Sequence, residues 1–157
     1  MTDGVTSREL RRGVFPGLQL QTYADETTEP FWSAARHDRL VVPRCRECGT
    51  FRLPPLPICH VCQSEVTDWE ELPGTGTVLT FTIVHHPLHP DLAAVCPYVS
   101  AVVDLDGTQG EGARILVNVT DCDPAAVSIG APVRIVFDHV NDDMSIPRAN
   151  LVADRPV

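Results

Sequence analysis

Residues 45–62 read CRECGTFRLPPLPICHVC, and the two Cys-x-x-Cys pairs in this stretch are Cys45 with Cys48 and Cys59 with Cys62. Two thiolates three residues apart on a tight turn can face one ion, and a second pair completes a tetrahedron with metal–sulfur distances of about 2.3 Å. Gly49 follows the first pair and permits the left-handed turn that lets backbone amides reach the sulfurs. The spacing predicts a zinc ribbon over residues 40–72.

The composition favours a cytoplasmic globular protein. The chain has 157 residues, 43% of them hydrophobic, which suits one or two small domains with a genuine core. Its longest apolar run is five residues, whereas a membrane helix needs about 20. Residues 1–12 lack the apolar core of a secretory signal. We therefore expect a cytoplasmic location and no membrane partner.

All four predicted ligands are cysteines, so no coordination position stays open and the predicted Zn²⁺ is structural rather than catalytic. The four thiolates leave a net double negative charge, which Arg44, Arg46 and Arg52 are close enough in sequence to offset. Two disulfides, or reduced cysteines in a core, are the alternative interpretation of the spacing. Disulfides are rare in cytosolic proteins, so we prefer the metal site.

An arm and one short helix are predicted before the cysteines. Residues 1–27 contain glycines and a proline without sustained periodicity, which is typical of a poorly structured arm. A helix is expected over residues 29–38, with Thr28 as its N-cap, and an extended segment over residues 40–44. The apolar face of the helix is expected to carry Phe31, Ala34 and Ala35.

After residue 77 the apolar pattern changes to a period of two, which indicates β-strands. The alternating positions are Leu79, Phe81 and Ile83; Val99, Ala101 and Val103; Ile115, Val117 and Val119; and Val133, Ile135 and Phe137. A fifth strand is expected near residues 145–152, and a short non-strand piece at 123–127. Five strands in this arrangement suit an OB-type barrel.

The predicted fold class is therefore mainly β, in three parts. Residues 1–39 form an N-terminal arm and helix, residues 40–72 form the zinc ribbon, and residues 73–157 form a five-stranded OB-fold barrel.

The charged residues and missing motifs exclude several functions. All twelve basic residues are arginine, which excludes a Schiff-base aldolase, a pyridoxal-phosphate lysine and a Walker A lysine. Residues 53–157 hold four Arg and fourteen acids, a net charge of −10 that would repel nucleic acid. G-x-S-x-G and H-E-x-x-H motifs are absent. We expect no catalysis by this chain alone.

Three histidines, His85, His86 and His89, end the first predicted barrel strand. A second metal site is one interpretation of this cluster. Exposed or loop-packing positions, and the wall of a ligand channel or a partner surface, are the others.

Several features follow one another along the chain in a characteristic order. They are Pro30-Phe31-Trp32, Leu40, the two cysteine pairs, Gly74-Thr-Gly76-Thr-Val78, Pro97-Tyr98, Ile129-Gly130 and Asp138. Over residues 28–152 this order resembles the acyl-CoA-associated OB-fold/zinc-ribbon protein family. One departure is the second cysteine pair and Gln63 after it, where the family often has Pro and Gly; this affects turn geometry more than ligation.

The resemblance implies a non-catalytic accessory subunit in a hetero-oligomer. Family members accompany thiolase-fold enzymes, hydroxymethylglutaryl-CoA synthases or MaoC-type hydratases. The actinobacterial type accompanies thiolase-like retro-aldolases of the lipid-transfer-protein type, which shorten steroid side chains attached to CoA. The arm, helix and ribbon would then dock on the partner and the barrel would cover or extend the acyl-CoA channel. The resemblance carries over no functional residue except the cysteine ligands.

Two other functions stay open. One is a free-standing acyl-CoA or lipid carrier that uses the barrel interior or its mouth. The other is a single-stranded nucleic-acid-binding OB module, for which Phe81, Tyr98 and Phe137 are the possible stacking residues. The acidic charge opposes the second.

Overall fold

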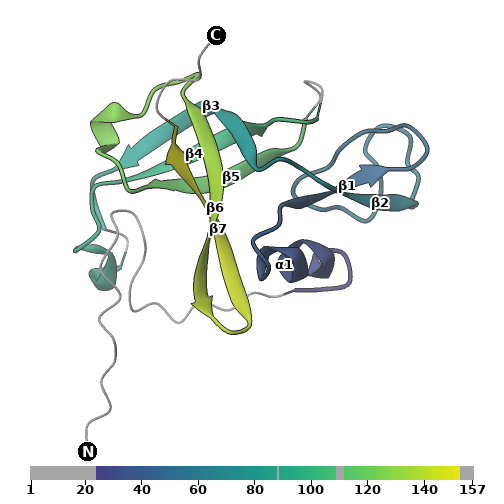
Figure 1. The fold of residues 1–157 in the computed structure, drawn as a ribbon, viewed down its shortest axis with the longest axis horizontal. Helices are drawn as coiled ribbons and strands as arrows, with labels where there is room; N and C mark the ends of the chain where they lie inside the picture. The colour runs from purple at the N-terminus through teal and green to yellow at the C-terminus, as the bar shows by residue number, and fades with distance from the viewer. Residues whose placement is uncertain (1–23, 88, 109–111, 153–157) are drawn as a thin grey trace, which may run out of the picture.

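The computed structural model describes residues 24–87, 89–108 and 112–152 (Figure 1). A helix, α1 (Glu29–Ala35), precedes a two-stranded antiparallel sheet made of β1 (Val41–Cys45) and β2 (Thr67–Glu71). Figure 1 shows this sheet and its loops as a lobe on the right, beside the barrel. Among the described residues, no helix is long and apolar enough to cross a membrane.

The larger part of the structure is a closed five-stranded barrel with the strand order β3-β4-β5-β7-β6. Its strands are β3 (Thr75–Val84), β4 (Tyr98–Leu105), β5 (Arg114–Thr120), β6 (Pro132–Asn141) and β7 (Met144–Leu151). All pairs are antiparallel except β5 with β7, which is parallel. The five-stranded OB-type barrel expected from the alternating pattern is therefore confirmed.

Two short 3₁₀ helices lie in the barrel loops. They are η1 (Pro90–Leu92), between β3 and β4, and η2 (Pro124–Ala126), between β5 and β6. The second occupies the non-strand piece expected at 123–127, and it lets the chain cross from β5 to β6 so that β7 can enter between them.

Of the twelve predicted inward positions of the barrel strands, eight are buried, Phe81, Ile83 and Phe137 are partly buried against the core, and one is exposed. A bulge interrupts the β3–β4 register between Val78 and Thr80. Val78 is therefore 1% exposed, whereas Leu79, which the alternation placed in the core, is 37% exposed. The prediction for Leu79 is wrong because a bulge adds one residue and reverses the side-chain direction after it.

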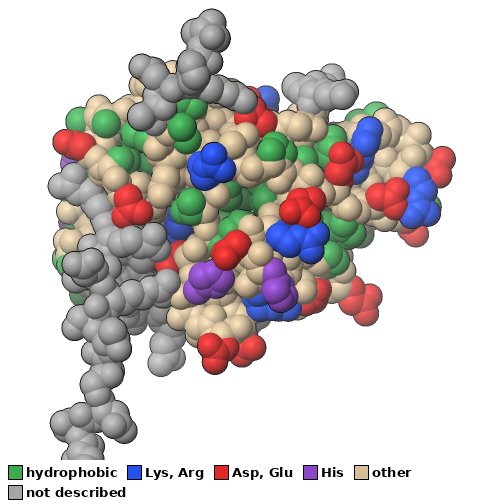
Figure 2. All heavy atoms as spheres, viewed as in Figure 1, with side chains coloured by type: hydrophobic (Ala, Val, Ile, Leu, Met, Phe, Trp, Pro, Cys, Tyr) green, Lys and Arg blue, Asp and Glu red, His purple; other side chains and the backbone are tan. Residues whose placement is uncertain are grey.

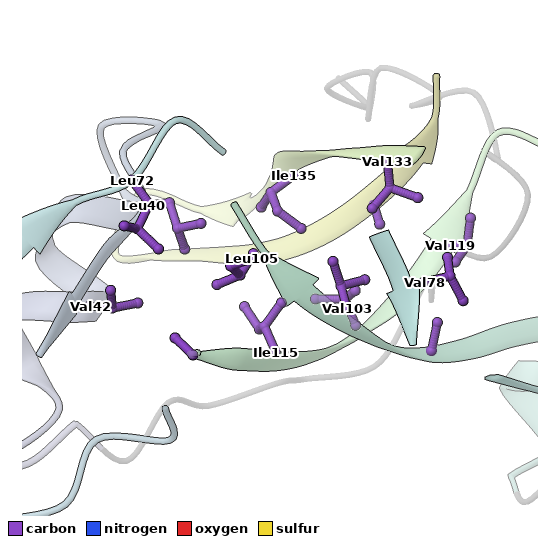
Figure 3. Packing of buried hydrophobic residues seen from close by; sticks show 14 of the residues in the cluster. Leu40, Val42, Leu72, Val78, Val103, Leu105, Ile115, Val119, Val133 and Ile135 are labelled. Carbon is purple, nitrogen blue, oxygen red and sulfur yellow. The ribbon is translucent and has the colours of Figure 1, made fainter. Parts of the chain in front are cut away.

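The ribbon and the barrel share one hydrophobic core. Figure 3 shows Leu40, Val42 and Leu72 from the ribbon beside Leu105 and Ile135 from the barrel. These side chains belong to a single cluster that continues through the barrel interior. Loss of the ribbon would therefore expose apolar surface at one end of the barrel, which couples the stabilities of the two parts.

Helix α1 is shorter than expected. It ends at Ala35 instead of residue 38, because Asp38 adopts a left-handed conformation with φ +58°. The Arg39 amide donates back to the Ala34 carbonyl at 3.1 Å, as at many helix C-termini. Its apolar face is as expected, with Phe31, Ala34 and Ala35 buried.

Thr28 is the N-cap residue of α1, as predicted, but its side chain makes no capping hydrogen bond to the helix. It pairs with Asp25 instead. The Thr28 amide donates to Asp25 Oδ1 at 2.9 Å, and the Asp25 amide donates to Thr28 Oγ1 at 3.1 Å. This reciprocal pair is a capping box one turn before the helix.

Replacing Asp25 by alanine is expected to lower the melting temperature by about 2–4 °C, because the turn that leads into α1 loses its cap. The Thr28 hydroxyl and then its amide hold the pKa of Asp25 below the usual 3.8. The contribution of the ionised Asp25 carboxylate to the free energy of unfolding is therefore complete above about pH 4. It is lost as the pH falls through the lowered pKa. Thermal melts of Asp25→Ala at pH 7, with Glu26→Ala as the neighbouring control, test this. Equal melting temperatures for the two variants would contradict it.

Candidate metal centre

The four cysteines predicted as ligands lie together at the tip of the ribbon. Their sulfur atoms are all within 4.8 Å of one another. The Sγ atoms of Cys45 and Cys62 are 3.5 Å apart, as are those of Cys48 and Cys59. A tetrahedral ion with bonds of about 2.3 Å separates its ligands by about 3.8 Å. The donor set and its spacing therefore fit one four-coordinate thiophilic ion such as Zn²⁺.

The two cysteine pairs sit on turns with the same hydrogen bonds. The Cys45 amide donates to the Thr50 carbonyl and the Gly49 amide to the Cys45 carbonyl, each at 2.9 Å. In the second turn the Cys59 amide donates to the Ser64 carbonyl and the Gln63 amide to the Cys59 carbonyl, also at 2.9 Å. The repetition explains how two separate segments present their sulfurs to one point.

Both turns need a left-handed residue after the second cysteine. Gly49 has φ +75°, and Gln63 has φ +61° at the equivalent position. A side chain in this region costs about 1 kcal/mol or more. Gln63, at a position where the family often has Gly, therefore raises the backbone energy of the second turn but leaves the positions of the sulfur atoms unchanged.

Replacing Gln63 by glycine is accordingly expected to stabilise the protein by about 1 kcal/mol, which raises the melting temperature by about 2–4 °C. Gln63→Ala is the matched control, because it removes the same side chain and keeps the strained backbone. Thermal melts of the metal-loaded chain measure both. The idea fails if alanine stabilises as much as glycine does.

Backbone amides favour the thiolate form at two of the sulfurs. The amides of Cys48 and Glu47 lower the pKa of Cys45. In the second turn, the amides of Cys62 and Val61 lower the pKa of Cys59 in the same way. Such amide-to-sulfur bonds favour the anion that a metal binds.

The other two thiols behave in opposite ways. The pKa of Cys48 is lowered by the Thr50 side chain and then its amide. The pKa of Cys62 is raised to about 12, because burial and the three neighbouring sulfurs outweigh the Ser64 amide, which acts in the other direction. Four thiolates at this spacing repel one another, so the cluster needs a cation to hold all four charges.

Arginines border the ribbon, and two of the three expected to offset the thiolates pair with carboxylates on β2. Arg44 Nη1 lies 3.0 Å from Glu70 Oε2, and Arg46 pairs with Asp68. Figure 2 shows such basic and acidic side chains side by side over the ribbon lobe. These cross-strand pairs hold β2, whose acidic sequence did not suggest a strand, against β1.

Arg52 differs from these two arginines. It is 2% exposed, and its Nη2 donates to Thr67 Oγ1. Within the described part of the chain, its Nε and Nη1 have no hydrogen-bond partner. Of the three arginines, Arg52 therefore remains the one whose charge no carboxylate in these ranges offsets.

A second metal centre at the histidines is not formed by the described residues. Across the described ranges, the four cysteines are the one group of three or more potential ligands that lie together. His85, His86 and His89 are exposed, and His89 accepts from the Asp91 amide at 3.3 Å at the start of η1. The histidines are loop residues here.

A Ser-His-Asp chain that sequence reasoning missed links the turn after α1 to the β6–β7 hairpin. Ser145 Oγ lies 2.7 Å from His139 Nδ1, and His139 Nε2 lies 2.9 Å from Asp38 Oδ1. Ser145 is 2% exposed, so its hydroxyl is not accessible to a substrate as a nucleophile would be. The chain joins segments 101 residues apart, which no local motif reveals.

The aromatic residues considered for nucleic-acid stacking are packed into the protein. Tyr98 is 8% exposed, and Phe81 and Phe137 pack against the barrel core. Base stacking needs an exposed ring face. The geometry therefore does not favour that function.

Family models describe both halves of the structure. Residues 32–68 match the model of the ChsH2 rubredoxin-like zinc ribbon domain, and residues 69–138 match that of the ChsH2 C-terminal OB-fold domain. Together they cover the ribbon and most of the barrel.

Two bacterial relatives are α subunits of hydratases. A probable enoyl-CoA hydratase alpha subunit from Thermomonospora curvata is 39% identical over 118 residues, which are 74% of this chain and 35% of that protein. A 3-oxo-4,17-pregnadiene-20-carboxyl-CoA hydratase alpha subunit from Mycobacterium tuberculosis is 31% identical over 122 residues, 78% of this chain and 37% of that protein. This chain thus spans little more than a third of either relative.

Two further proteins match over most of their own length. A DUF35 domain-containing scaffold protein from Methanocaldococcus jannaschii is 39% identical over 106 residues, 66% of this chain and 71% of that protein. A solved structure described as "Ltp2-ChsH2(DUF35) aldolase" is 34% identical, with a TM-score of 0.72, and covers 83% of this chain and 98% of the matched chain. The chain therefore belongs to the DUF35 family, as a ChsH2-type zinc ribbon followed by an OB-fold domain.

Proposed function

We propose that this chain is a non-catalytic accessory subunit of a thiolase-fold acyl-CoA enzyme, a retro-aldolase that acts on steroid side-chain CoA thioesters. The observation that carries the proposal is the 34% identity over 98% of the matched chain in the Ltp2-ChsH2(DUF35) aldolase. The name of the mycobacterial relative supports a steroid thioester as the substrate class. The partner contributes the catalytic residues, and the complex binds the acyl-CoA.

The proposal includes one structural Zn²⁺ held by Cys45, Cys48, Cys59 and Cys62. Its role is to fix the two cysteine turns in place so that the ribbon presents a rigid surface. When bound, a structural zinc ion supplies folding free energy, about 10–16 kcal/mol in zinc-finger peptides. It takes no part in the reaction, because four sulfurs leave no position for a substrate.

The ribbon offers an apolar surface suited to a protein partner. Four large hydrophobic side chains between 42% and 60% exposed lie within eleven residues of chain: Leu56, Ile58, Val61 and Val66. Isolated exposed hydrophobics are common, and the closeness of these four along the chain supports an interaction site. We propose that this group, together with α1, contacts the enzyme subunit.

Coexpression tests the proposal. The chain is expected to co-purify with a coexpressed thiolase-fold protein of the lipid-transfer-protein type, and the cleavage of a steroid side-chain CoA thioester is expected only from the complex. The double variant Leu56→Asp/Ile58→Asp is expected to weaken the complex at least tenfold. Ile129→Asp is the matched control, because Ile129 is 70% exposed and lies in the barrel loop between η2 and β6.

Two results would contradict the proposal. One is a monomer that finds no such partner; the other is turnover of a thioester by this chain in isolation. Sub-micromolar binding of a complete acyl-CoA without any partner would favour the carrier function instead.

A further inference from the structure

An apolar groove runs between α1, the loop after β1 and the outer side of β5. Its volume is about 450 Å³. The side chains that form its walls include Phe31, Trp32, Leu53, Pro54, Pro55 and Leu116. The volume lies within the range of small-molecule sites, which are concave and mostly apolar with a few polar groups.

The groove contains an apolar residue where a barrel strand should be polar. Leu116 stands at an outward position of β5, between the buried Ile115 and Val117, and is 71% exposed. An outward leucine beside a tryptophan leaves apolar surface that a bound molecule would remove from water. The outer face of β5 is therefore suited to contact with a bound molecule as well as with water.

The walls suit a rigid apolar molecule better than a peptide. Pro54, Pro55 and Pro147 have no backbone N–H to donate. A peptide lying in the groove would find few partners for its own amides, and unpaired buried amides are costly. A hydrocarbon ring system has no such groups, and proline and aromatic rings offer it rigid apolar walls.

Two polar side chains line the groove, Thr28 and Arg114, and they differ in the hydrogen-bonding groups that they have left for a ligand. Thr28 Oγ1 is already occupied, since it accepts from the Asp25 amide and donates to Asp25 Oδ1 at 2.9 Å. Arg114 donates from Nε to Asp104 Oδ1 at 2.6 Å. Among the described residues, its two terminal Nη groups have no hydrogen-bond partner. Donors for an oxygen acceptor therefore lie at the Arg114 side of the groove.

We propose that this groove binds a flat polycyclic acyl group, the steroid part of the thioester, with Arg114 donating a hydrogen bond to a keto oxygen on its rings. This inference rests on the proposed function, because the partner enzyme would deliver the thioester. It goes further in assigning this chain a substrate-binding site of its own. The groove is open along one side, so the isolated chain binds the steroid in the micromolar range or weaker.

The two tryptophans of the chain allow a direct test. Trp32 lines the groove, whereas Trp69 lies in β2 and lines a neighbouring pocket that shares only Pro55 with the groove. In the full-length, zinc-loaded Trp69→Phe variant, progesterone, a ketosteroid probe, is expected to quench the emission of Trp32 saturably. In Trp32→Phe, the emission of Trp69 is expected to stay unchanged.

Matched substitutions identify the site. In the Trp69→Phe background, Leu116→Gln is expected to weaken progesterone binding at least tenfold, and Ile129→Gln, equally exposed elsewhere on the barrel, to leave it unchanged. Arg114→Met is expected to weaken it about tenfold, the loss of one charged hydrogen bond. Melting temperatures check that each variant is folded. Absence of saturable quenching, or equal loss in Leu116→Gln and Ile129→Gln, would overturn the proposal.

Experiments on the complex with the enzyme subunit distinguish a failure of this inference from a failure of the proposed function. If the complex forms and Leu116→Gln leaves the KM for the steroid thioester unchanged, the groove is not the steroid site and the accessory role stands. If Leu116→Gln prevents the complex from forming but leaves progesterone binding intact, the groove holds a protein segment and the inference fails. If progesterone binding depends on Leu116 but no enzyme partner associates, the groove stands and the accessory role fails.

Discussion

Replacing Cys59 by serine is expected to unfold the ribbon, to reduce the zinc content from one ion per chain to a small fraction, and to lower the melting temperature by about 10 °C or more. Cys59 is fully buried, and its sulfur lies 3.5 Å from that of Cys48. Serine supplies no thiolate, so three sulfurs remain for an ion that prefers four. Because Leu40, Val42 and Leu72 share the barrel core, the loss extends beyond the ribbon.

Metal analysis, thermal melts and near-ultraviolet circular dichroism measure this effect. Trp69 lies in β2, so its near-ultraviolet signal reports on the ribbon. Cys96→Ser is the matched control. Cys96 lies outside the four-sulfur cluster and packs against a small hydrophobic cluster formed by Leu92, Val95 and Tyr98. Treating the wild-type chain with a chelator is expected to produce the same spectral change as Cys59→Ser. A chelated chain with an unchanged spectrum and unchanged partner binding would disprove the structural role of the metal.

A substitution at Gly76 is expected to be the most damaging one in the barrel. A Cβ atom at this position would overlap the Asp104 backbone oxygen and lie 2.8 Å from Val103 Cγ1. Gly76 pairs with Leu105 of β4 and with Val133 of β6. Because β3 is paired with β4 on one side and with β6 on the other at this point, β3 cannot move away from one strand without disturbing its pairing with the other.

The expected cost of Gly76→Ala is about 3 kcal/mol, at the upper end for overpacked sites, which corresponds to a fall of about 6–12 °C in melting temperature. Gly130→Ala is the control that adds the same methyl group. Its Cβ would meet nothing within 4 Å, so only the cost of its positive φ, about 1 kcal/mol, remains. Urea denaturation of both variants measures the difference. Similar stabilities for the two would show that the strands adjust more easily than the geometry implies.

Local spacing was enough to predict the features that repeat along the chain. The two cysteine pairs placed four sulfurs at one point because each pair is positioned by hydrogen bonds within its own turn. The alternation of apolar residues predicted the barrel strands, since a strand of period two must bury one face. At Leu79 this reasoning failed, because a bulge depends on the register with β4 and leaves no mark in the alternation.

Other features depend on contacts between distant segments, and only the tertiary structure decided them. The acidic strand β2 forms because Arg44 of β1 and Arg46, directly after β1, lie across from its carboxylates. The Asp38–His139–Ser145 chain and the groove of Trp32 and Leu116 each join residues about 80 to 100 positions apart. The sequence by itself determined a four-cysteine ribbon and a small barrel, because those follow from spacing within each segment. Their common core and the groove beside α1 followed only from how the chain brings separate segments together.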